Sequence, residues 1–281
     1  MVDPDRVVWE SGLVRVGAFR CPVGDPLFFD SGPARNYCFV FPRTAVSIQH
    51  EDERAFVANP NIVTFYNCGQ EYRRGAISPH GDRCDWFGVS AEVARDVVRS
   101  FDEAVDDRPE RPFRFSRGLS DATSFLMQRR LFASVAAGGP VEALALEEAV
   151  IALLERVVGS VYGARRSGAP VKQEDAICEA ERILSRNWDR DLHLADVARE
   201  VGLSVYHLCR TFRRITGNTL HQYRSELRVR ACLELVAAPG ARLVDVAMDA
   251  GFCSHSHFTN AFHRAFGEPP SALRDCGGAT F

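Results

Sequence analysis

The chain has 281 residues, which is long for one domain and sufficient for two domains that each bury a core. Hydrophobic residues make up 46% and charged residues 25%, and the sequence contains no run of 18 uncharged apolar residues, so no membrane-spanning helix is expected. Residues 1–6 are polar and acidic and lack the features of a secretory signal, and we therefore expect a cytoplasmic protein.

The overall charge hides a local feature. The formal net charge is −3, yet residues 203–230 contain six arginines and a single acid, Glu226. A local basic face of this kind is what attraction to DNA phosphates requires. The nine cysteines are dispersed and include no Cys-x-x-Cys pair, so we expect no disulfide framework.

The first 105 residues or so are rich in aromatic and turn-forming residues and show little helical periodicity. Apolar runs over residues 36–41, 45–48, 62–66 and 85–89 predict strands, because clusters of Gly, Pro, Asn and Asp separate them. Many short strands in so small a region favour a β-barrel or a sandwich.

Helices dominate the sequence after the strands. Ser120 is a candidate N-cap for a helix over 121–136, and Pro140 is a candidate start for a helix over 141–162. The second helix carries an apolar stripe made of Leu144, Ala145, Ala149, Ile151, Ala152, Leu153 and Val157. The stripe either packs on its own barrel or forms a dimer interface. Residues 163–170 lack core-forming side chains and predict an interdomain linker.

An internal repeat occupies the last third of the chain. Residues 196–202 return as residues 245–251, an offset of 49 positions, and the match continues beyond the glycines at an offset of 50. Leu208, Phe212, Arg214 and Gly217 recur as Phe258, Phe262, Arg264 and Gly267. Because the extra residue falls directly after the glycine, we expect a turn at that point.

Each copy has the pattern of a helix-turn-helix unit. A short helix ends at Gly202 or Gly251, where a positive φ reverses the chain, and Ser204 or Ser254 then caps a second helix. The apolar face of that helix consists of Leu208, Phe212 and Ile215 in the first copy and Phe258, Phe262 and Phe266 in the second. The opposite face of the first copy carries Val205, Tyr206, Cys209, Arg210 and Arg213, which are free to enter a major groove.

The segment between the copies, residues 220–237, contains no Gly or Pro and predicts one continuous helix. Eighteen helical residues span about 27 Å. A rod of that length suits two recognition helices that enter successive major grooves, about 34 Å apart. Its apolar residues, Leu227, Ala231, Leu235 and Val236, are also expected to be buried.

Residues 176–275 resemble the AraC/XylS family of transcriptional regulators, with residues 194–217 similar to its first motif and residues 251–274 similar to its signature ending. The resemblance implies a sequence-specific regulator, by family tendency an activator that works with RNA polymerase, whose partner is a double-stranded DNA operator. The implied fold class is α+β. It comprises a ligand-sensing and dimerisation domain over 1–165, a linker over 166–175 and an all-α domain over 176–276 with two helix-turn-helix motifs joined by a linker helix.

The resemblance also implies the DNA-contacting residues, which lie on the two recognition helices and their caps. They are Ser204, Val205, Tyr206, His207, Cys209, Arg210, Arg213, Arg214, Ser254, His255, Ser256, His257, Thr259, Asn260 and Arg264. Within this set, the implied base-reading positions are Tyr206, Cys209, Arg210, His255, Ser256 and Asn260, and the implied phosphate contacts are Arg213, Arg214 and Arg264. Arg210 suits guanine and Asn260 suits adenine. Family members often carry a positive residue at the position of Asn260, so the second helix is expected to read bases more weakly.

The N-terminal half is similar to a cupin-type sensor, with the β-barrel over about 1–110 and helices over about 119–163. We expect it to bind a small-molecule effector and to form a homodimer, with no cofactor. Catalytic cupins use a His-x-His pair, whereas this half contains only His50 and His80, so enzymatic activity is not expected. The candidate effector-binding residues are Tyr66, Cys68, Tyr72, Arg73, Arg83 and Trp86.

An alternative is a metal- or thiol-responsive regulator that uses cysteines of the same half. The candidate ligands are Cys38, Cys68, His80 and Cys84, but their spacing matches neither a finger nor a cupin site, and buried structural cysteines are commoner. Two further classes are a DNA-repair methyltransferase, which requires a clustered four-cysteine zinc site, and a DNA-architecture protein without an effector. The dispersed cysteines disfavour the first and the sensor half disfavours the second.

Overall fold

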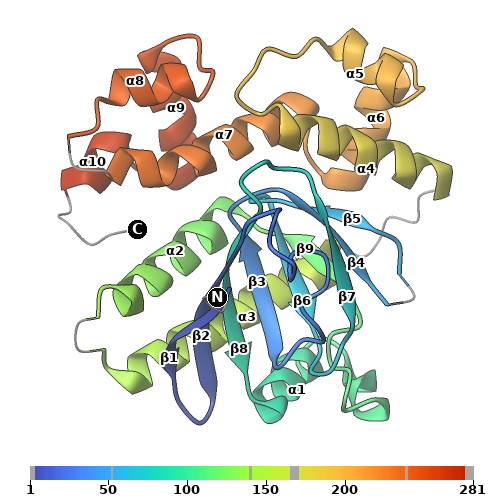
Figure 1. Ribbon diagram of the computed structural model, residues 1–281, viewed down its shortest axis with the longest axis vertical. Helices are drawn as coiled ribbons and strands as arrows, with labels where there is room; N and C mark the ends of the chain where they lie inside the picture. The colour runs from blue at the N-terminus through green and yellow to red at the C-terminus, as the bar shows by residue number, and fades with distance from the viewer. Residues whose placement is uncertain (1–3, 52, 139–140, 165–170, 238–239, 276–281) are drawn as a thin grey trace. The chain divides into compact units, whose positions relative to one another are not determined.

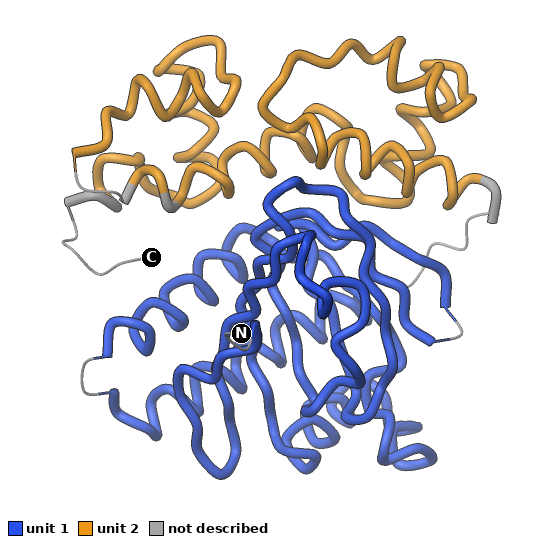
Figure 2. Tube along the Cα trace, viewed as in Figure 1, with its two compact units in different colours: residues 1–165 blue, residues 166–281 orange. Residues whose placement is uncertain are grey.

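The structure is a computed structural model that describes residues 4–51, 53–138, 141–164, 171–237 and 240–275. The chain forms two compact units, unit 1 over residues 1–165 and unit 2 over residues 166–281 (Figure 2). Within the described ranges, no helix combines the length and the apolar character that crossing a bilayer would require.

Unit 1 contains two antiparallel sheets (Figure 1). The larger sheet has the strand order β1-β2-β8-β3-β6-β9 and the smaller one has the order β5-β4-β7. The strands are β1 Asp5–Glu10, β2 Val14–Cys21, β3 Tyr37–Pro42, β4 Val46–His50, β5 Phe56–Ala58, β6 Ile62–Tyr66, β7 Tyr72–Ala76, β8 Asp82–Val89 and β9 Arg117–Leu119. Together with the helical unit 2, this sheet-rich unit confirms the predicted α+β class.

The faces of the larger sheet are covered by different layers. Successive side chains of a strand point to opposite faces. On β8, Phe87 and Val89 therefore join a core shared with the helices of unit 1, whereas Cys84 and Trp86 join a second core shared with the smaller sheet. This alternation places every second residue of β8 between the two sheets.

Three α-helices and a short 3-10 helix complete unit 1. They are α1 Ala91–Arg99, η1 Glu103–Asp107, α2 Ala122–Ala136 and α3 Ala143–Ala164. A buried ion pair ties α2 to the sheet, because Nη1 of Arg129 donates to Oδ2 of Asp85 on β8 at 2.6 Å. Of the apolar stripe predicted on α3, Leu153 and Val157 are fully buried in the core of unit 1, whereas Leu144 is 62% exposed. Ala145 and Ala152 are also exposed, and Ala149 and Ile151 are half-buried, so only part of the stripe packs on its own unit and the dimer interface stays a prediction.

Several predicted boundaries in unit 1 differ from the structure. Asp121, not Ser120, caps α2, because its Oδ1 accepts a hydrogen bond from the Ser124 N–H at 2.7 Å. The Ser120 N–H instead donates to the carbonyl of Asn61, next to the β6–β9 ladder. Strands β1, β2, β5, β7 and β9 were not predicted: β5 and β9 have three residues each, and β2 and β7 mix arginine and glycine with apolar residues.

The predicted linker is shorter than expected. Helix α3 continues to Ala164, and α4 begins at Val171. The linker predicted over 163–170 therefore overlaps the end of α3, and the linker predicted over 166–175 overlaps the start of α4. Residues 165–170 lie outside the described residues, as does Pro140, the predicted start of α3.

His50 is a buried histidine at the end of β4. Its ring is 1% exposed and lies against Tyr66 and Phe56, at centroid distances of 4.7 and 5.8 Å. The Gln70 side-chain nitrogen lies 3.1 Å from Nδ1, and Gln70 Oε1 accepts from the Asn67 N–H, which orients the amide as a donor toward the ring. Desolvation by burial lowers the pKa of His50, although Glu53 opposes this effect, and the neutral imidazole is also the form in which Nδ1 can accept the Gln70 hydrogen bond.

Unit 2 is entirely helical in its described part. Its helices are α4 Val171–Arg186, α5 Leu194–Glu200, α6 Val205–Thr216, α7 Leu220–Ala237, α8 Leu243–Asp249, α9 His255–Phe266 and α10 Pro270–Asp275. Figure 1 shows α5 and α6 beside one end of α7, and α8 and α9 beside the other end. The observed α7 has the bounds predicted for the rod. Leu227 and Val236 are buried as predicted, but Leu235 is 45% exposed, contrary to expectation.

Both turns have the predicted chemistry. Gly202 and Gly251 adopt φ angles of 68° and 74°, the left-handed region that glycine tolerates. The side chains of Ser204 and Ser254 accept hydrogen bonds from the backbone N–H three residues later, which caps α6 and α9. The predicted apolar faces are also confirmed, because Leu208, Phe212, Phe258 and Phe262 are each 0% exposed and Ile215 and Phe266 are half-buried.

A second contact, besides the rod, ties the two helix-turn-helix units together. Arg228, in the middle of α7, donates from Nε to the Trp188 carbonyl at 2.6 Å and from Nη2 to the Arg190 carbonyl at 3.3 Å, both in the α4–α5 loop. Its guanidinium also lies 5.8 Å from the ring centroid of Phe252, in the second turn. At Gly251 a Cβ atom would lie 2.2 Å from the Asp189 carbonyl oxygen. We call this contact of Arg228, the α4–α5 loop and the second turn the Arg228 clasp.

The lowered pKa of His50 predicts a pH dependence of stability. Between the lowered value and the ordinary value of 6.5, the unfolded chain binds a proton that the folded chain does not bind. The free energy of unfolding of unit 1 should therefore fall as the pH drops below about 6.5, and His50→Leu should remove that part of the fall. Urea unfolding followed by tryptophan fluorescence in a Trp188→Phe background measures it, because Trp9 and Trp86 then report on unit 1 alone. His80→Gln, at an exposed loop position, is the control, and an equal effect of both variants would contradict the assignment.

The Arg228 clasp predicts different costs for two glycine substitutions. Gly202→Ala should cost about 1–2 kcal/mol, because only the positive φ opposes a side chain and no atom lies within 4 Å of the new Cβ. Gly251→Ala should cost about 1–3 kcal/mol more, because the Asp189 carbonyl must also move. Hydrogen-exchange protection of peptides that cover α6 and α9 measures both costs, and equal losses in the two variants would show that the second turn does not press on the loop.

Candidate nucleic-acid interface

The residues predicted to contact DNA lie at the surface of α6 and α9. Of the fifteen, thirteen are exposed, and His257 and Thr259 are half-buried. His257 is turned toward its own turn, where its Nδ1 lies 3.1 Å from Cys253 Sγ and its ring packs edge-on against Phe252. The largest exposed side chain of α6 is Tyr206, which is 66% exposed and whose hydroxyl accepts from Arg210 Nη1 at 3.5 Å.

The basic face of the first helix-turn-helix unit, α5 and α6, is smaller than the number of arginines in residues 203–230 suggests. Arg210, Arg213 and Arg214 are exposed on α6, and Arg214 also donates to Gln173 of α4. Arg228 belongs to the clasp, and Arg230 is 5% exposed and lies 3.7 Å from Glu226. Three of the six arginines are therefore exposed on α6, whereas Arg228 and Arg230 are engaged inside unit 2.

Arg224 is the remaining arginine of that segment. It is half-buried, and desolvation lowers its pKa, while Asp191 and Asp189 oppose this effect. Its position on α7 sets it apart from the exposed face of α6. The sequence count did not separate structural from surface arginines, because α7 has no strongly one-sided pattern of apolar residues.

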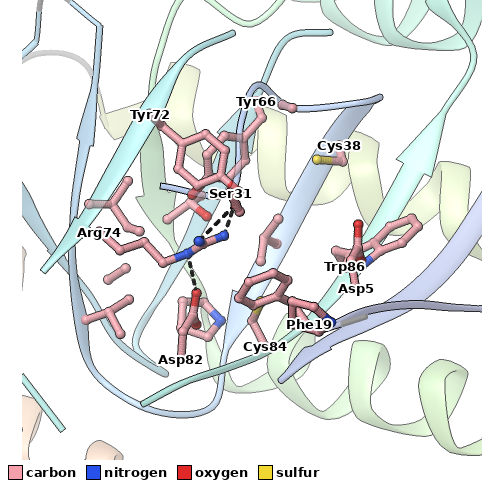
Figure 3. A pocket seen from close by; sticks show the side chains of 18 of the residues that line it. Asp5, Phe19, Ser31, Cys38, Tyr66, Tyr72, Arg74, Asp82, Cys84 and Trp86 are labelled. Carbon is pink, nitrogen blue, oxygen red and sulfur yellow. Dashed lines mark hydrogen bonds and ion pairs between the residues drawn. The ribbon is translucent and has the colours of Figure 1, made fainter. Parts of the chain in front are cut away.

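A separate candidate site is the interior cavity between the two sheets of unit 1 (Figure 3). Its volume is about 120 Å³, and Tyr66, Tyr72 and Trp86 line it, as the sequence predicted for an effector site. The other predicted members, Cys68, Arg73 and Arg83, do not line it. All three are exposed, and Cys68 Sγ contacts the Arg35 carbonyl at 3.4 Å in a turn.

Successive side chains of a strand point to opposite faces of the sheet, and this alternation explains why two of the predicted arginines do not line the cavity. Arg73 lies between Tyr72 and Arg74 on β7, so it points to the opposite face of the sheet from both. Arg83 is likewise on the opposite face of β8 from Asp82. Arg74 and Asp82, which do line the cavity, are not among the six candidates, although alternation from Tyr72 and Trp86 identifies both.

Arg74 is the most highly connected side chain of the cavity. Its Nε lies 2.7 Å from Asp82 Oδ2, its Nη2 donates to the Tyr72 hydroxyl at 2.6 Å, and its Nη1 donates to Ser31 Oγ at 3.0 Å. The guanidinium also lies over the Phe19 ring, 4.1 Å from its centroid. Figure 3 shows these groups gathered on one side of the cavity, with Trp86 and Asp5 on another side. Desolvation raises the pKa of Asp82, although Arg74 opposes this effect.

The four residues proposed as alternative metal or thiol ligands do not come together. Cys38 and Cys84 line the cavity, but they pair with Gly88 and Pro42 at separate points of the β3–β8 ladder. Cys68 and His80 are exposed outside the cavity. Burial raises the pKa of both Cys38 and Cys84, which disfavours thiolates. Within the described ranges, no group of three or more His, Cys, Asp or Glu side chains is arranged to hold a metal ion.

Comparisons with known proteins match unit 2. Residues 197–275 match the family model of a helix-turn-helix domain. The chain is 34% identical over 91 residues to the HTH-type transcriptional regulator GlxA of Rhizobium meliloti (strain 1021), which is 32% of this chain and 28% of that protein. It is 31% identical over 94 residues to the virulence regulon transcriptional activator VirF of Yersinia enterocolitica, which is 34% of this chain and 35% of that protein. The matched segment is thus about a third of the length of these relatives.

A solved structure of similar extent is that of ToxT from Vibrio cholerae O395, at 12% identity and a TM-score of 0.39, covering 94% of this chain and 98% of that one. The curated matches named above are transcriptional regulators, which agrees with the expectation of a regulator rather than an enzyme. Unit 2, with two helix-turn-helix motifs joined by a linker helix, is therefore similar to the helix-turn-helix domains of transcriptional regulators, which agrees with the resemblance to the AraC/XylS family noted in the sequence.

Proposed function

We propose that the chain is a sequence-specific transcriptional regulator that binds a double-stranded DNA operator with both helix-turn-helix units. The observation that carries the proposal is the pairing of two capped recognition helices, α6 and α9, in one unit braced by α7 and the Arg228 clasp. Exposed polar and basic residues on both helices support contact with a major groove.

The contacts divide by chemistry. Arg210 reads guanine and Asn260 reads adenine, because their planar donor and acceptor groups match those base edges. Arg213, Arg214 and Arg264 hold phosphates, which sets the position on the duplex but not the sequence. Helix α9 presents one arginine, Arg264, whereas α6 presents three. The first helix-turn-helix unit therefore contributes more to the affinity for DNA.

Unit 1 is proposed to be a cupin-like sensor whose interior cavity takes a small-molecule effector. The aromatic lining and the position of the cavity between the two sheets support this role. The chain acts as a homodimer, and the exposed side of α3 around Leu144 and Ala145 is the proposed contact. Activation through RNA polymerase is proposed because VirF, a relative in unit 2, is named as an activator.

Selection from random duplex oligonucleotides with the full chain tests the DNA-binding proposal. We expect one enriched site with two elements about one helical turn apart. Arg210→Ala should cost about 1–3 kcal/mol at that site and relax the preference for one base pair. Arg213→Ala, the matched control on the same helix, should weaken all duplexes equally and reduce the salt dependence by about one phosphate contact. Absence of any enriched sequence, or equal behaviour of the two variants, would contradict the proposal.

A further inference from the structure

The space inside the cavity of unit 1 is small, and the cavity is partly open to solvent. It measures about 120 Å³ and is lined largely by apolar and aromatic side chains. A dry cavity of about 150 Å³ lined by apolar residues is known to accept benzene. A ligand of about one six-membered ring therefore matches the space available.

The charges around the cavity balance. Four charged side chains line it, Asp5 and Asp82 of one sign and Arg35 and Arg74 of the other. Arg35 is exposed and Asp5 is half-buried, where the Asp5 carboxylate accepts from Trp86 Nε1 at 2.7 Å. Arg74 and Asp82 are buried and form an ion pair with each other. No charge of either sign is left in excess.

An anionic ligand finds no unengaged cation in the buried part of the cavity, and an ion pair with the exposed Arg35 would be screened by water and contribute little. All three nitrogens of the Arg74 guanidinium already bind Asp82, Tyr72 or Ser31. A ligand carboxylate would also approach the buried Asp82 carboxylate, whose own pKa is raised by desolvation. Burying a second, unpaired carboxylate there is unfavourable.

A cationic ligand is disfavoured for a different reason. Aromatic rings attract cations to their faces, but Arg74 already lies over Phe19 and Tyr72, at 4.1 and 4.9 Å from the ring centroids. A second cation near those rings would meet the like charge of Arg74 without a free carboxylate to offset it, since Asp82 is already paired.

One hydrogen-bonding group does remain for a ligand. The Ser31 and Tyr72 hydroxyls lie 3.3 Å apart, and both accept from Arg74. Only one of their two protons is needed for the bond between them. Among the described residues, the other hydroxyl proton has no acceptor within hydrogen-bond distance, so it is available to an acceptor oxygen of a ligand.

We propose that the cavity takes an uncharged ligand of about one ring that carries an oxygen acceptor, such as a hydroxyl, near Ser31 and Tyr72. This inference rests on the proposed effector role of unit 1 and names the chemical class of the effector. The side of the cavity with Arg74 at its centre orients the oxygen, and the side with Trp86, whose indole N–H is held by Asp5, receives the ring (Figure 3).

Three probes of one shape and different charge test the proposal: benzyl alcohol, benzoate and benzylammonium. Each is titrated into the full chain carrying Trp188→Phe, so that the fluorescence of the cavity residue Trp86 reports binding against Trp9 alone. We expect benzyl alcohol to bind about tenfold or more tightly than either ion. Equal or tighter binding of benzoate or benzylammonium would overturn the proposal, as would no binding by any of the three.

Two variants examine the reason for this selectivity. Asp82→Asn leaves the Arg74 guanidinium without its carboxylate, so benzoate affinity should rise by about tenfold or more while benzyl alcohol affinity changes little. Tyr72→Phe removes one hydroxyl and should weaken benzyl alcohol but not toluene, and it keeps the test available if Asp82→Asn fails to fold. Unchanged benzoate affinity in folded Asp82→Asn, or equal losses for the alcohol and toluene in Tyr72→Phe, would contradict the assignment.

Operator binding separates this inference from the proposed function. The order of probe affinities is measured without DNA, so it stands or falls independently of transcriptional control. If benzyl alcohol binds selectively but leaves operator affinity unchanged at saturation, the ligand class is correct and this ligand is not an effector. If a charged probe binds best and changes operator affinity, the effector role holds and the inferred class is wrong.

Discussion

The two recognition helices of unit 2 depend on the Arg228 clasp for their relative position. A helix of 18 residues alone would hold the two helix-turn-helix units at a given distance. It would leave the second helix-turn-helix unit free to pivot at the end of α7. Arg228 closes this freedom because its planar guanidinium binds two carbonyls of the α4–α5 loop while its face lies near Phe252 of the second turn. Gly251 completes the contact, since any side chain there would strike the Asp189 carbonyl.

The same residue shows how an electrostatic count can mislead. Arg228 appears in the sequence as one of six arginines in a basic segment, and only the structure shows that it binds backbone carbonyls instead of phosphate. Arg230 is buried beside Glu226 in the same helix. The basic surface available to DNA is therefore concentrated on α6. This strengthens the expectation that the first helix-turn-helix unit contributes most of the affinity for DNA.

The sequence was most informative where local chemistry determines structure. The turns at Gly202 and Gly251, the caps at Ser204 and Ser254 and the bounds of α7 all follow from neighbouring residues, and each was predicted correctly. Unit 1 was harder, because pairing between distant strands decides which side of a strand faces the interior. The sequence does not show that Arg74 and Asp82, and not Arg73 and Arg83, face the cavity, because this depends on the sheets in which β7 and β8 pair.

A helical-phase experiment tests the central claim, that α6 and α9 are held rigidly on one side of the duplex. The full chain is titrated against its selected site with either about 5 or about 10 base pairs inserted between the two elements, half a turn or a full turn of DNA. A rigid unit cannot follow either insertion, so affinity should fall in both cases to that of a site with one element. Retention of full affinity with either insertion would show that the two helix-turn-helix units move independently and would contradict the account.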